Sequence, residues 1–172
     1  MTSILGYWDI RGLAQPIRNM LVYQGVEFED KRYVFGPEPD FDGEEWLSEK
    51  STLGLRFPNL PYYMDDDVKI TQSLAILRYL ARKHELAAKD EDETLELDML
   101  EQQARDLSWG LLMAGLDWNR ELNAGAFEGF PALTSYTKRF EELPNIEEYF
   151  ASDKYNKYPI LGPMLKWGFE KE

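Results

Sequence analysis

The stretch ILGYWDIRGLAQPIRNML, residues 4–21, decides the fold of this chain. It begins with a short β-prone run at residues 4–8 and continues with apolar residues at helical spacing from Leu13 to Leu21. Gly25 then ends the predicted helix. A strand that passes directly into an amphipathic helix predicts an α/β unit at the start of the chain.

The next segments extend this unit by alternating strands and helices. Residues 28–35 form an extended run with interleaved charges, and a short helix is predicted around Trp46. Residues 57–64 are apolar but contain two prolines, which predicts an irregular or edge strand. Residues 68–70 return as the second strand of a hairpin, and a helix opens at residues 72–73. The predicted order is βαβαββα, which requires a mixed sheet with helices packed on it.

The second half of the chain is predicted to be helical. A polar, acidic segment at residues 87–93 separates it from the first half, so we expect an α/β domain over residues 1–86 and a helical domain over residues 87–172. Within the second domain, one apolar stripe of a long helix predicts a buried face; its members are Leu97, Leu100, Ala104, Leu107, Leu111 and Ala114.

The charge balance excludes several classes of partner. Among 172 residues, 32 are acidic and 19 basic, which gives a net charge of −13. Binding to nucleic acids or to anionic membrane surfaces needs a basic face, so neither partner is expected. No apolar run approaches the roughly 20 residues of a membrane-spanning helix, and no signal peptide is evident, so we expect a cytoplasmic protein.

The scarcity of thiol and imidazole groups limits the chemistry. The chain has no Cys and a single His, His84. This composition excludes disulfides, thiolate metal sites, cysteine catalysis and any site with two imidazoles, and no metal is expected. Residues 65–67, three aspartates, are predicted to form a solvated turn rather than a cation site. A thiol reaction would need a thiol from a substrate or cofactor.

Several linked segments resemble one known family. Residues 4–13 resemble the N-terminal signature of mu-class glutathione transferases, and residues 46–50, 57–62 and 70–73 follow in the family's order. The resemblance implies a thioredoxin-like N-terminal domain followed by a reduced helical C-terminal domain. It also implies that glutathione is the cosubstrate and that its thiolate is conjugated to electrophilic hydrophobic molecules in detoxification. The alternative is a glutathione-binding or scaffolding relative with weak or no transferase activity.

The chain also departs from the family pattern. It is shorter than the family's usual length, and the missing segment is expected between Leu116 and Phe127. Gly43 stands where mu-class members commonly place an arginine that reaches toward glutathione. Leu116 stands where many mammalian members place a tyrosine that assists the electrophilic substrate. We expect the first departure to weaken glutathione binding and the second to alter the acceptor pocket.

The resemblance assigns catalysis to Tyr7, at the end of the first strand, as the hydroxyl donor that stabilises the glutathione thiolate. Judged without this context, Tyr7 is a packing residue. Gln72 and Ser73 are expected to bind the γ-glutamyl end at a helix N-terminus, although a plain Ser N-cap is the alternative. Leu60-Pro61 is expected to be a cis bond that exposes the Leu60 backbone to glutathione, with an ordinary trans proline as the alternative.

The remaining glutathione contacts are also carried by the resemblance. Trp46 and Lys50 lie one helical turn apart and suit a glycyl carboxylate, although a core Trp and a solvated Lys would give the same pattern. The full predicted set of glutathione-binding residues is Trp8, Leu13, Trp46, Lys50, Asn59, Leu60, Pro61, Gln72, Ser73 and Asp106.

The family's homodimer supplies the last expectations. Phe57 is expected to insert into the partner subunit, and Arg78 and Asp98 to pair across the interface; local packing and surface ion pairs are the alternative. Asp106 is expected to reach the α-amino group of glutathione bound to the other subunit.

Overall fold

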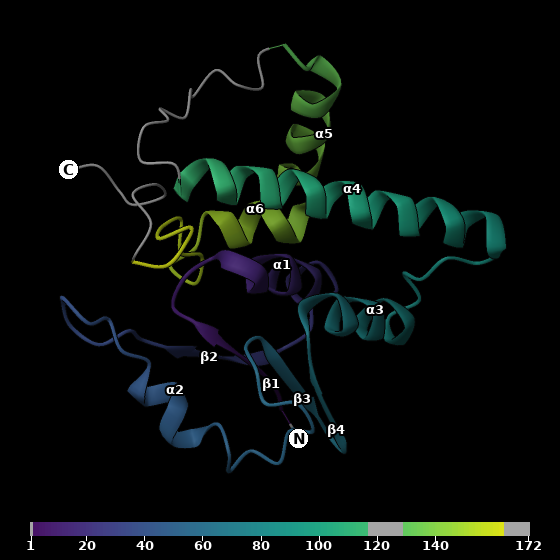
Figure 1. Ribbon diagram of the computed structural model, residues 1–172. Helices are drawn as coiled ribbons and strands as arrows, with labels where there is room; N and C mark the ends of the chain where they lie inside the picture. The colour runs from purple at the N-terminus through teal and green to yellow at the C-terminus, as the bar shows by residue number, and fades with distance from the viewer. Residues whose placement is uncertain (1, 117–128, 164–172) are drawn as a thin grey trace.

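The structure is a computed structural model that describes residues 2–116 and 129–163 (Figure 1). Four strands form one mixed sheet in the order β2-β1-β3-β4; they are β1 (Ser3–Trp8), β2 (Phe28–Tyr33), β3 (Tyr62–Asp65) and β4 (Val68–Thr71). Strand β1 runs parallel to β2 and antiparallel to β3, and β3 pairs with β4 as the predicted hairpin. The predicted βαβαββα order is therefore confirmed.

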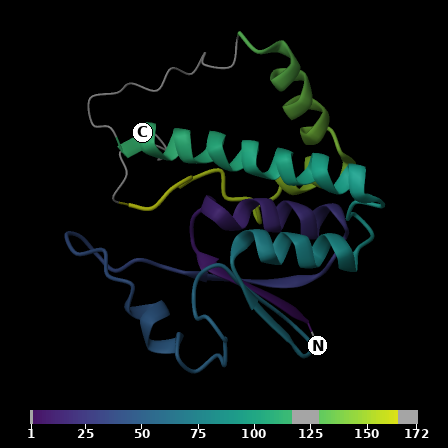
Figure 2. The same ribbon diagram turned by 45° about the vertical axis from the view of Figure 1, so that its right-hand side comes forward.

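Helices cover both faces of the sheet. Helices α1 (Gln15–Tyr23) and α3 (Ser73–Lys83) lie on one face, and the short α2 (Glu44–Glu49) lies on the other (Figures 1 and 2). A single 3-10 turn, η1 (Gly12–Ala14), leads from β1 into α1. The sheet therefore separates two apolar cores, and both extend to the end of β1.

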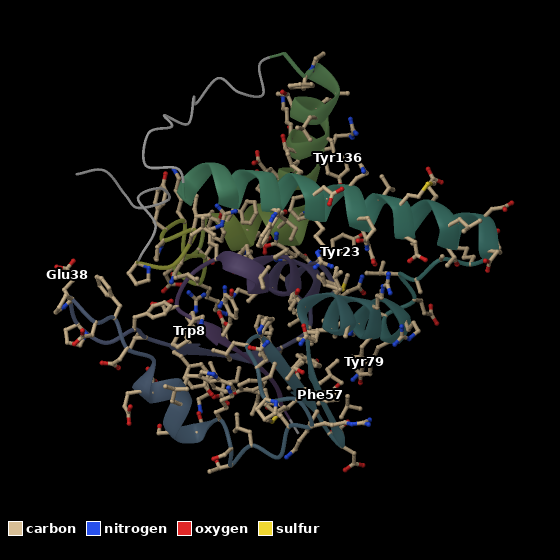
Figure 3. The ribbon with its side chains drawn as sticks, in the orientation of Figure 1. Trp8, Tyr23, Glu38, Phe57, Tyr79 and Tyr136 are labelled. Carbon is tan, nitrogen blue, oxygen red and sulfur yellow. The ribbon has the colours of Figure 1, made fainter. Side chains whose placement is uncertain are left out.

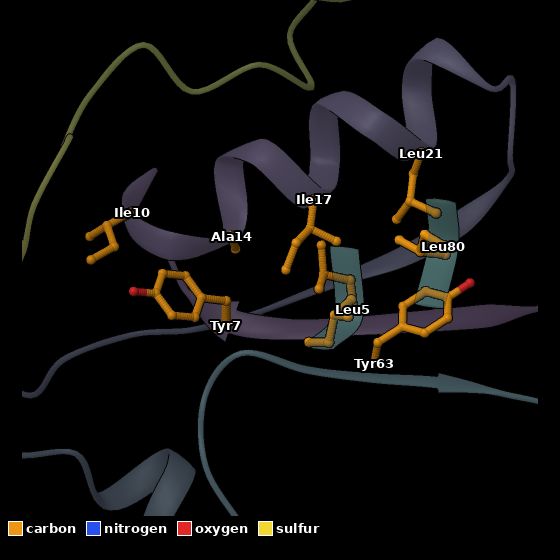
Figure 4. Close-up of a cluster of buried hydrophobic side chains, with 9 residues drawn as sticks. Leu5, Tyr7, Ile10, Ala14, Ile17, Leu21, Tyr63 and Leu80 are labelled. Carbon is orange, nitrogen blue, oxygen red and sulfur yellow. The ribbon is translucent and has the colours of Figure 1, made fainter. Parts of the chain in front are cut away.

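The two cores follow from the alternation of side chains along the strands. The first, here called the α1/α3 cluster, consists of Leu5, Tyr7, Ile10, Ala14, Ile17, Leu21, Tyr63, Ile76 and Leu80 (Figure 4). The second, here called the α2 cluster, consists of Tyr33, Trp46, Leu55 and Tyr62. Trp8 and Leu60 are partly buried and pack against both clusters.

Gly6 has a packing role that the strand pattern alone does not indicate. It lies opposite Tyr62 in the β1–β3 pairing. A Cβ atom at Gly6 would lie 2.2 Å from Cε1 and Cζ of Tyr62, far inside the normal carbon–carbon contact distance of about 3.5–4.0 Å. The missing side chain therefore makes room for the Tyr62 ring on the α2 side of the sheet.

A buried cation connects α1 to the sheet. The Arg18 side chain is 1% exposed, and its Nε donates to both carboxylate oxygens of Asp30 on β2, at 3.1 and 3.0 Å. Its Nη1 also donates to the Ile10 carbonyl at 2.8 Å. The ion pair and the bond to Ile10 offset part of the hydration that the guanidinium loses on burial.

Three helices make up the described part of the second half: α4 (Glu91–Leu116), α5 (Pro131–Glu141) and α6 (Pro144–Phe150). Helix α6 packs on α1, where the Asn145 amide donates to the Tyr23 carbonyl at 3.1 Å and Ile146 is fully buried. The helical character predicted for residues 87–172 is confirmed for these segments.

The prediction that one stripe of α4 is buried is wrong for its described side chains. Leu97, Leu100 and Leu107 are 42%, 56% and 48% exposed. The physical reason is the choice of neighbours: in the described part of the chain, the extensive helix contacts join α1 to α3 and α6, and α5 to α6, and α4 makes none of comparable extent. The side chains of Leu111 and Ala114, near the end of α4, lie outside the described residues.

The aspartate turn also differs from its prediction in one position. Asp65 is 8% exposed rather than solvated, because its carboxylate accepts from Tyr79 at 3.2 Å and pairs with Lys83. Across residues 2–116 and 129–163, no group of three or more His, Asp or Glu side chains lies close enough to hold a metal ion. None of the helices in this part of the chain is long and apolar enough to cross a membrane.

Candidate active site

The strand register brings the predicted site residues to one edge of the sheet. Gly6 on β1 lies opposite Tyr62 on β3, which in turn lies opposite Thr71 on β4. The residues that end β1, precede β3 and follow β4 therefore share this edge. They include Tyr7, Trp8, Leu60, Pro61, Gln72 and Ser73.

Tyr7 is buried at this edge, with 7% of its surface exposed. Its ring belongs to the α1/α3 cluster, and its hydroxyl points out of that cluster toward the loop that carries Ile10 (Figure 4). The hydroxyl oxygen accepts a hydrogen bond from the Leu13 backbone N–H at 3.2 Å. The phenol proton is then left to be donated to another acceptor.

The electrostatics of Tyr7 keep this proton on the phenol. Burial raises the pKa of Tyr7, while the Leu13 N–H and the charge of Arg18 lower it in part. The net direction is upward, so the hydroxyl is neutral at physiological pH. Tyr7 is thus suited to donate a hydrogen bond to an anion and not to act as a base.

Gly12 leaves room for the contact between Tyr7 and Leu13, a role that was not predicted from the sequence. It has a φ of +39°, and a Cβ atom there would lie 2.7 Å from the Tyr7 oxygen. Its N–H donates to the Ile160 carbonyl at 2.9 Å, and the Arg11 N–H donates to the Pro159 carbonyl at 2.9 Å. A segment nearly 150 residues away in the sequence therefore fixes the loop that presents Leu13 to Tyr7, and no local signal could have revealed it.

Trp8 is half-buried and packs against aromatic neighbours (Figure 3). Its ring is stacked on Phe35 at a centroid distance of 4.2 Å and lies edge-on to Tyr33 at 6.4 Å. Gly43 lies against the same ring, since a Cβ atom there would be 3.0 Å from Trp8 Cη2. Any side chain at position 43 would have to displace this ring or point away from it.

Helix α2 supplies Trp46 and Lys50. Trp46 is 5% exposed and belongs to the α2 cluster, as the packing alternative for this residue predicted. Lys50 is half-buried, and its ammonium group pairs with none of the described residues. An unpaired, half-buried ammonium group is available to an anionic ligand.

The Leu60–Pro61 bond is cis, as predicted. The Leu60 N–H donates a hydrogen bond to Oδ1 of the preceding residue, Asn59, at 2.9 Å, and not to a strand of the sheet. Pro61 itself is buried, and Asn59 is exposed. The Leu60 carbonyl and N–H thus lie at the edge that also carries Tyr7.

Helix α3 begins directly after this edge. Its N-cap is Gln72, with a φ of +74° and no side-chain cap bond, and Ser73 is its first helical residue. The alternative in which Ser73 is the N-cap is therefore wrong by one position. The helix is 11 residues long, and its first N–H groups and positive dipole end favour a carboxylate.

Of the remaining predicted residues, the structure brings only Leu13 to this edge. Leu13 is 56% exposed beside Tyr7, whereas Asp106 lies exposed on α4. Phe57 is 65% exposed on the loop before β3 (Figure 3). Arg78 pairs with Asp98 at 2.9 Å within the same chain, and also with Glu101. A role for these residues between two subunits stays a prediction, and the Leu116 side chain lies outside the described residues.

Comparisons with known proteins agree on one family. The profile described as "Glutathione S-transferase, N-terminal domain" matches residues 3–82. Glutathione S-transferase Mu 2 of Mus musculus is 39% identical over 215 aligned positions, which cover 97% of this chain and 99% of the mouse protein. A glutathione S-transferase of Dermatophagoides pteronyssinus is 57% identical over 116 residues, which cover 67% of this chain and 53% of the mite protein.

A solved structure gives the same result. A Pi-class glutathione S-transferase of Onchocerca volvulus superposes with a TM-score of 0.81 at 27% identity, covering 96% of this chain and 100% of that one. The chain therefore belongs to the glutathione S-transferase family, which uses glutathione as its cosubstrate, and its N-terminal part has the family's thioredoxin-like fold. Within the family, it is similar to mu-class members over nearly its whole length.

The comparison with the mouse protein also bears on length. The alignment extends over 215 positions, whereas this chain has 172 residues, so the mouse protein has residues without counterparts here. This confirms the predicted shortening. The place predicted for it, after Leu116, lies outside the described residues.

Proposed function

We propose that this chain is a glutathione transferase that joins the glutathione thiolate to an electrophilic carbon of small hydrophobic molecules. The observation that carries the proposal is the Tyr7 hydroxyl, whose oxygen accepts the Leu13 N–H while its own proton is free. In the reaction, the thiolate electron pair forms the new C–S bond, and the leaving group departs with the electrons of the bond that breaks.

The chain's contribution is to ionise and orient the thiol. A free cysteine thiol has a pKa of about 8.5, so only a few per cent is thiolate at neutral pH. Lowering this pKa by two units requires roughly 2.7 kcal/mol of preferential stabilisation of the anion. One hydroxyl donor in a partly dehydrated site provides an effect of this size.

The other site residues are assigned to parts of the tripeptide. The N-terminus of α3, with Gln72 and Ser73, binds the γ-glutamyl carboxylate, and the Leu60 backbone pairs with the cysteinyl unit. Trp46 and Lys50 bind the glycyl carboxylate. Trp8, Leu13, Asn59 and Pro61 complete the proposed binding site. The support for these assignments is the sheet edge shared by Leu60, Gln72 and Ser73, and the Lys50 ammonium group, which pairs with none of the described residues.

The direct test measures conjugation of a chlorinated nitrobenzene with glutathione. Tyr7→Phe is expected to raise the pKa of the bound thiol by about two units and to lower kcat/KM at neutral pH by about 100-fold. Tyr23→Phe, which changes an exposed tyrosine at the end of α1, is the matched control and should keep full activity. Glutathione binding without wild-type turnover would refute the transferase function and favour the alternative of a glutathione-binding relative.

We also propose that the chain acts as a homodimer, divided into domains at residues 1–86 and 87–172, and works in cytoplasmic detoxification. The exposed Phe57 and the exposed apolar residues of α4 support the dimer. Light scattering should give twice the chain mass of 20.1 kDa, and Phe57→Ala should shift the mass toward the monomer. A wild-type mass near 20.1 kDa would refute the dimer.

A further inference from the structure

Helix α2 has little of its own to hold it in place. It contains six residues, of which only Trp46 is buried, and its N-cap, Gly43, makes no side-chain cap bond. Isolated helices of this length are not stable in water. The position of α2, and of the side chains that it carries, therefore depends on its contacts with the sheet.

A polar network makes part of these contacts, beside the buried packing of Trp46 and a hydrogen bond from the Val34 N–H to Glu45. The hydroxyl of Tyr33, a fully buried residue on β2, donates to Glu49 Oε2 at 2.7 Å. Lys31 Nζ, on the same strand, donates to Glu49 Oε1 at 2.5 Å. The Tyr33 proton is used by the carboxylate, so Tyr62 is the donor in the 2.9 Å contact between the two tyrosine hydroxyls.

The charges in this network stabilise one another. Hydrogen bonds from Lys31 and then Tyr33 hold the pKa of Glu49 below its ordinary value. Partial burial lowers the pKa of Lys31, but the hydrogen bond to Glu49 and the nearby negative charges together outweigh it, and the net direction is upward. Burial raises the pKa of Tyr33. All three groups therefore keep the protonation states that the network needs at neutral pH.

The network acts at the point where α2 carries its candidate ligand contacts. Glu49 is the last residue of α2 and Lys50 is its C-cap, whose N–H donates to the Trp46 carbonyl at 2.9 Å. The Trp46 ring lies edge-on to Tyr33, with centroids 5.4 Å apart. Anchoring Glu49 to β2 thus fixes the backbone from which both Trp46 and Lys50 project.

We propose that Tyr33, Lys31 and Glu49 are positioning residues that hold α2 in the orientation that binds the glycyl carboxylate, and so set the affinity for glutathione. This inference rests on the proposed binding of glutathione by Trp46 and Lys50. None of the three residues needs to touch the ligand or the sulfur. Their loss should weaken binding without changing thiol ionisation, which depends on Tyr7 on the opposite face of the sheet.

The chain contains a matched control for this network. On the other face, Tyr79 donates to Asp65 beside Lys83, so the same three kinds of group connect α3 to the hairpin. Tyr33→Phe and Tyr79→Phe each remove one hydroxyl from a Tyr–carboxylate–Lys group. Helix α3, unlike α2, is also held by two fully buried residues, Ile76 and Leu80.

The experiment measures the Kd for glutathione by calorimetry, together with KM, kcat and the pKa of the bound thiol. Tyr33→Phe and Lys31→Met should each raise Kd and KM by about two- to tenfold, as expected for the loss of one hydrogen bond. They should leave kcat at saturating glutathione and the thiol pKa unchanged. Tyr79→Phe should leave Kd unchanged.

The outcomes separate this inference from the proposed function. If Tyr33→Phe and Lys31→Met lower the melting temperature but bind glutathione as tightly as wild type, the network is only structural and the inference is wrong. If wild type binds glutathione without turnover, the proposed activity fails while Kd still decides the inference. If wild type does not bind glutathione, both fail. If Tyr33→Phe does not fold, Lys31→Met, at a 31% exposed side chain, decides alone.

Discussion

Replacing Gly6 by alanine tests the packing of the sheet most sharply. The added Cβ would lie 2.2 Å from two ring carbons of Tyr62 and 2.7 Å from its oxygen. Tyr62 is 1% exposed and stacked near Trp46 at 6.0 Å, so the ring has no solvent-filled space to enter. The ring must move by more than about 1 Å to reach a normal contact distance.

The expected cost is the sum of two effects. Overpacking a filled core costs about 1–3 kcal/mol, and losing the buried contact between the Tyr62 and Tyr33 hydroxyls costs about 1 kcal/mol. Gly6→Ala should therefore lower the free energy of unfolding by about 2–4 kcal/mol, a large part of the usual 5–15 kcal/mol. The sign is informative, because alanine is otherwise favoured over glycine by about 0.5–1 kcal/mol within a strand.

Urea unfolding of the wild type and the variant measures this cost through the transition midpoint. The same substitution in a Tyr62→Leu background provides the control, because the smaller side chain leaves room for the new Cβ. There Gly6→Ala should cost much less than in the wild type. A cost below about 1 kcal/mol, or equal costs in both backgrounds, would refute the reasoning.

Three further predictions concern other parts of the molecule. Arg18→Met should lower the free energy of unfolding by about 2 kcal/mol in urea titrations, because it removes the buried hydrogen bonds to Asp30 and Ile10, although Asp30 keeps its ion pair with Arg32; a loss near zero would contradict this. Gly12→Ala should reduce kcat/KM about tenfold or more in the conjugation assay, because its Cβ would displace the Tyr7 hydroxyl; unchanged activity would argue against it. The pKa of Glu49 is lowered in the folded state, mainly by the Lys31 hydrogen bond. The ionised carboxylate therefore stabilises the fold fully above the ordinary pKa of 4.5, and this stabilisation is lost as the pH falls through the pKa of the folded state. Glu49→Gln should therefore destabilise the protein at neutral pH, and the difference from wild type should shrink on acidification; a constant difference would show that the carboxylate charge is not involved.

The sequence predicted the N-terminal domain well because its signals are local. The β-prone run at residues 4–8 lies within β1, and Ile17 and Leu21 lie within α1 and in the α1/α3 cluster. Leu13, by contrast, falls in η1 and is 56% exposed. The prediction was poorer where an element depends on distant neighbours. Residues 57–61 precede β3 instead of belonging to it, and Leu97, Leu100 and Leu107 of the α4 stripe are 42–56% exposed.

The site shows the same division. From the residue pattern alone, Tyr7 is a packing residue. Only the resemblance of residues 4–13 to the mu-class signature predicted that its hydroxyl stabilises the thiolate. The contacts that hold the site were not predicted, because they join residues far apart in the sequence. The bond from Gly12 to Ile160 and the contact of Tyr33 with Glu49 leave no periodic or spacing signal in either segment.

The two cores on opposite faces of the sheet have a consequence for how such a protein can be altered. The Tyr7 hydroxyl is held from the α1/α3 side, while α2 and its ligand contacts are held from the other side. Substitutions at well-separated sites without shared partners usually have additive effects. Reactivity of the sulfur and affinity for the tripeptide are then separately adjustable by substitutions that avoid Trp8 and Leu60, which pack against both clusters.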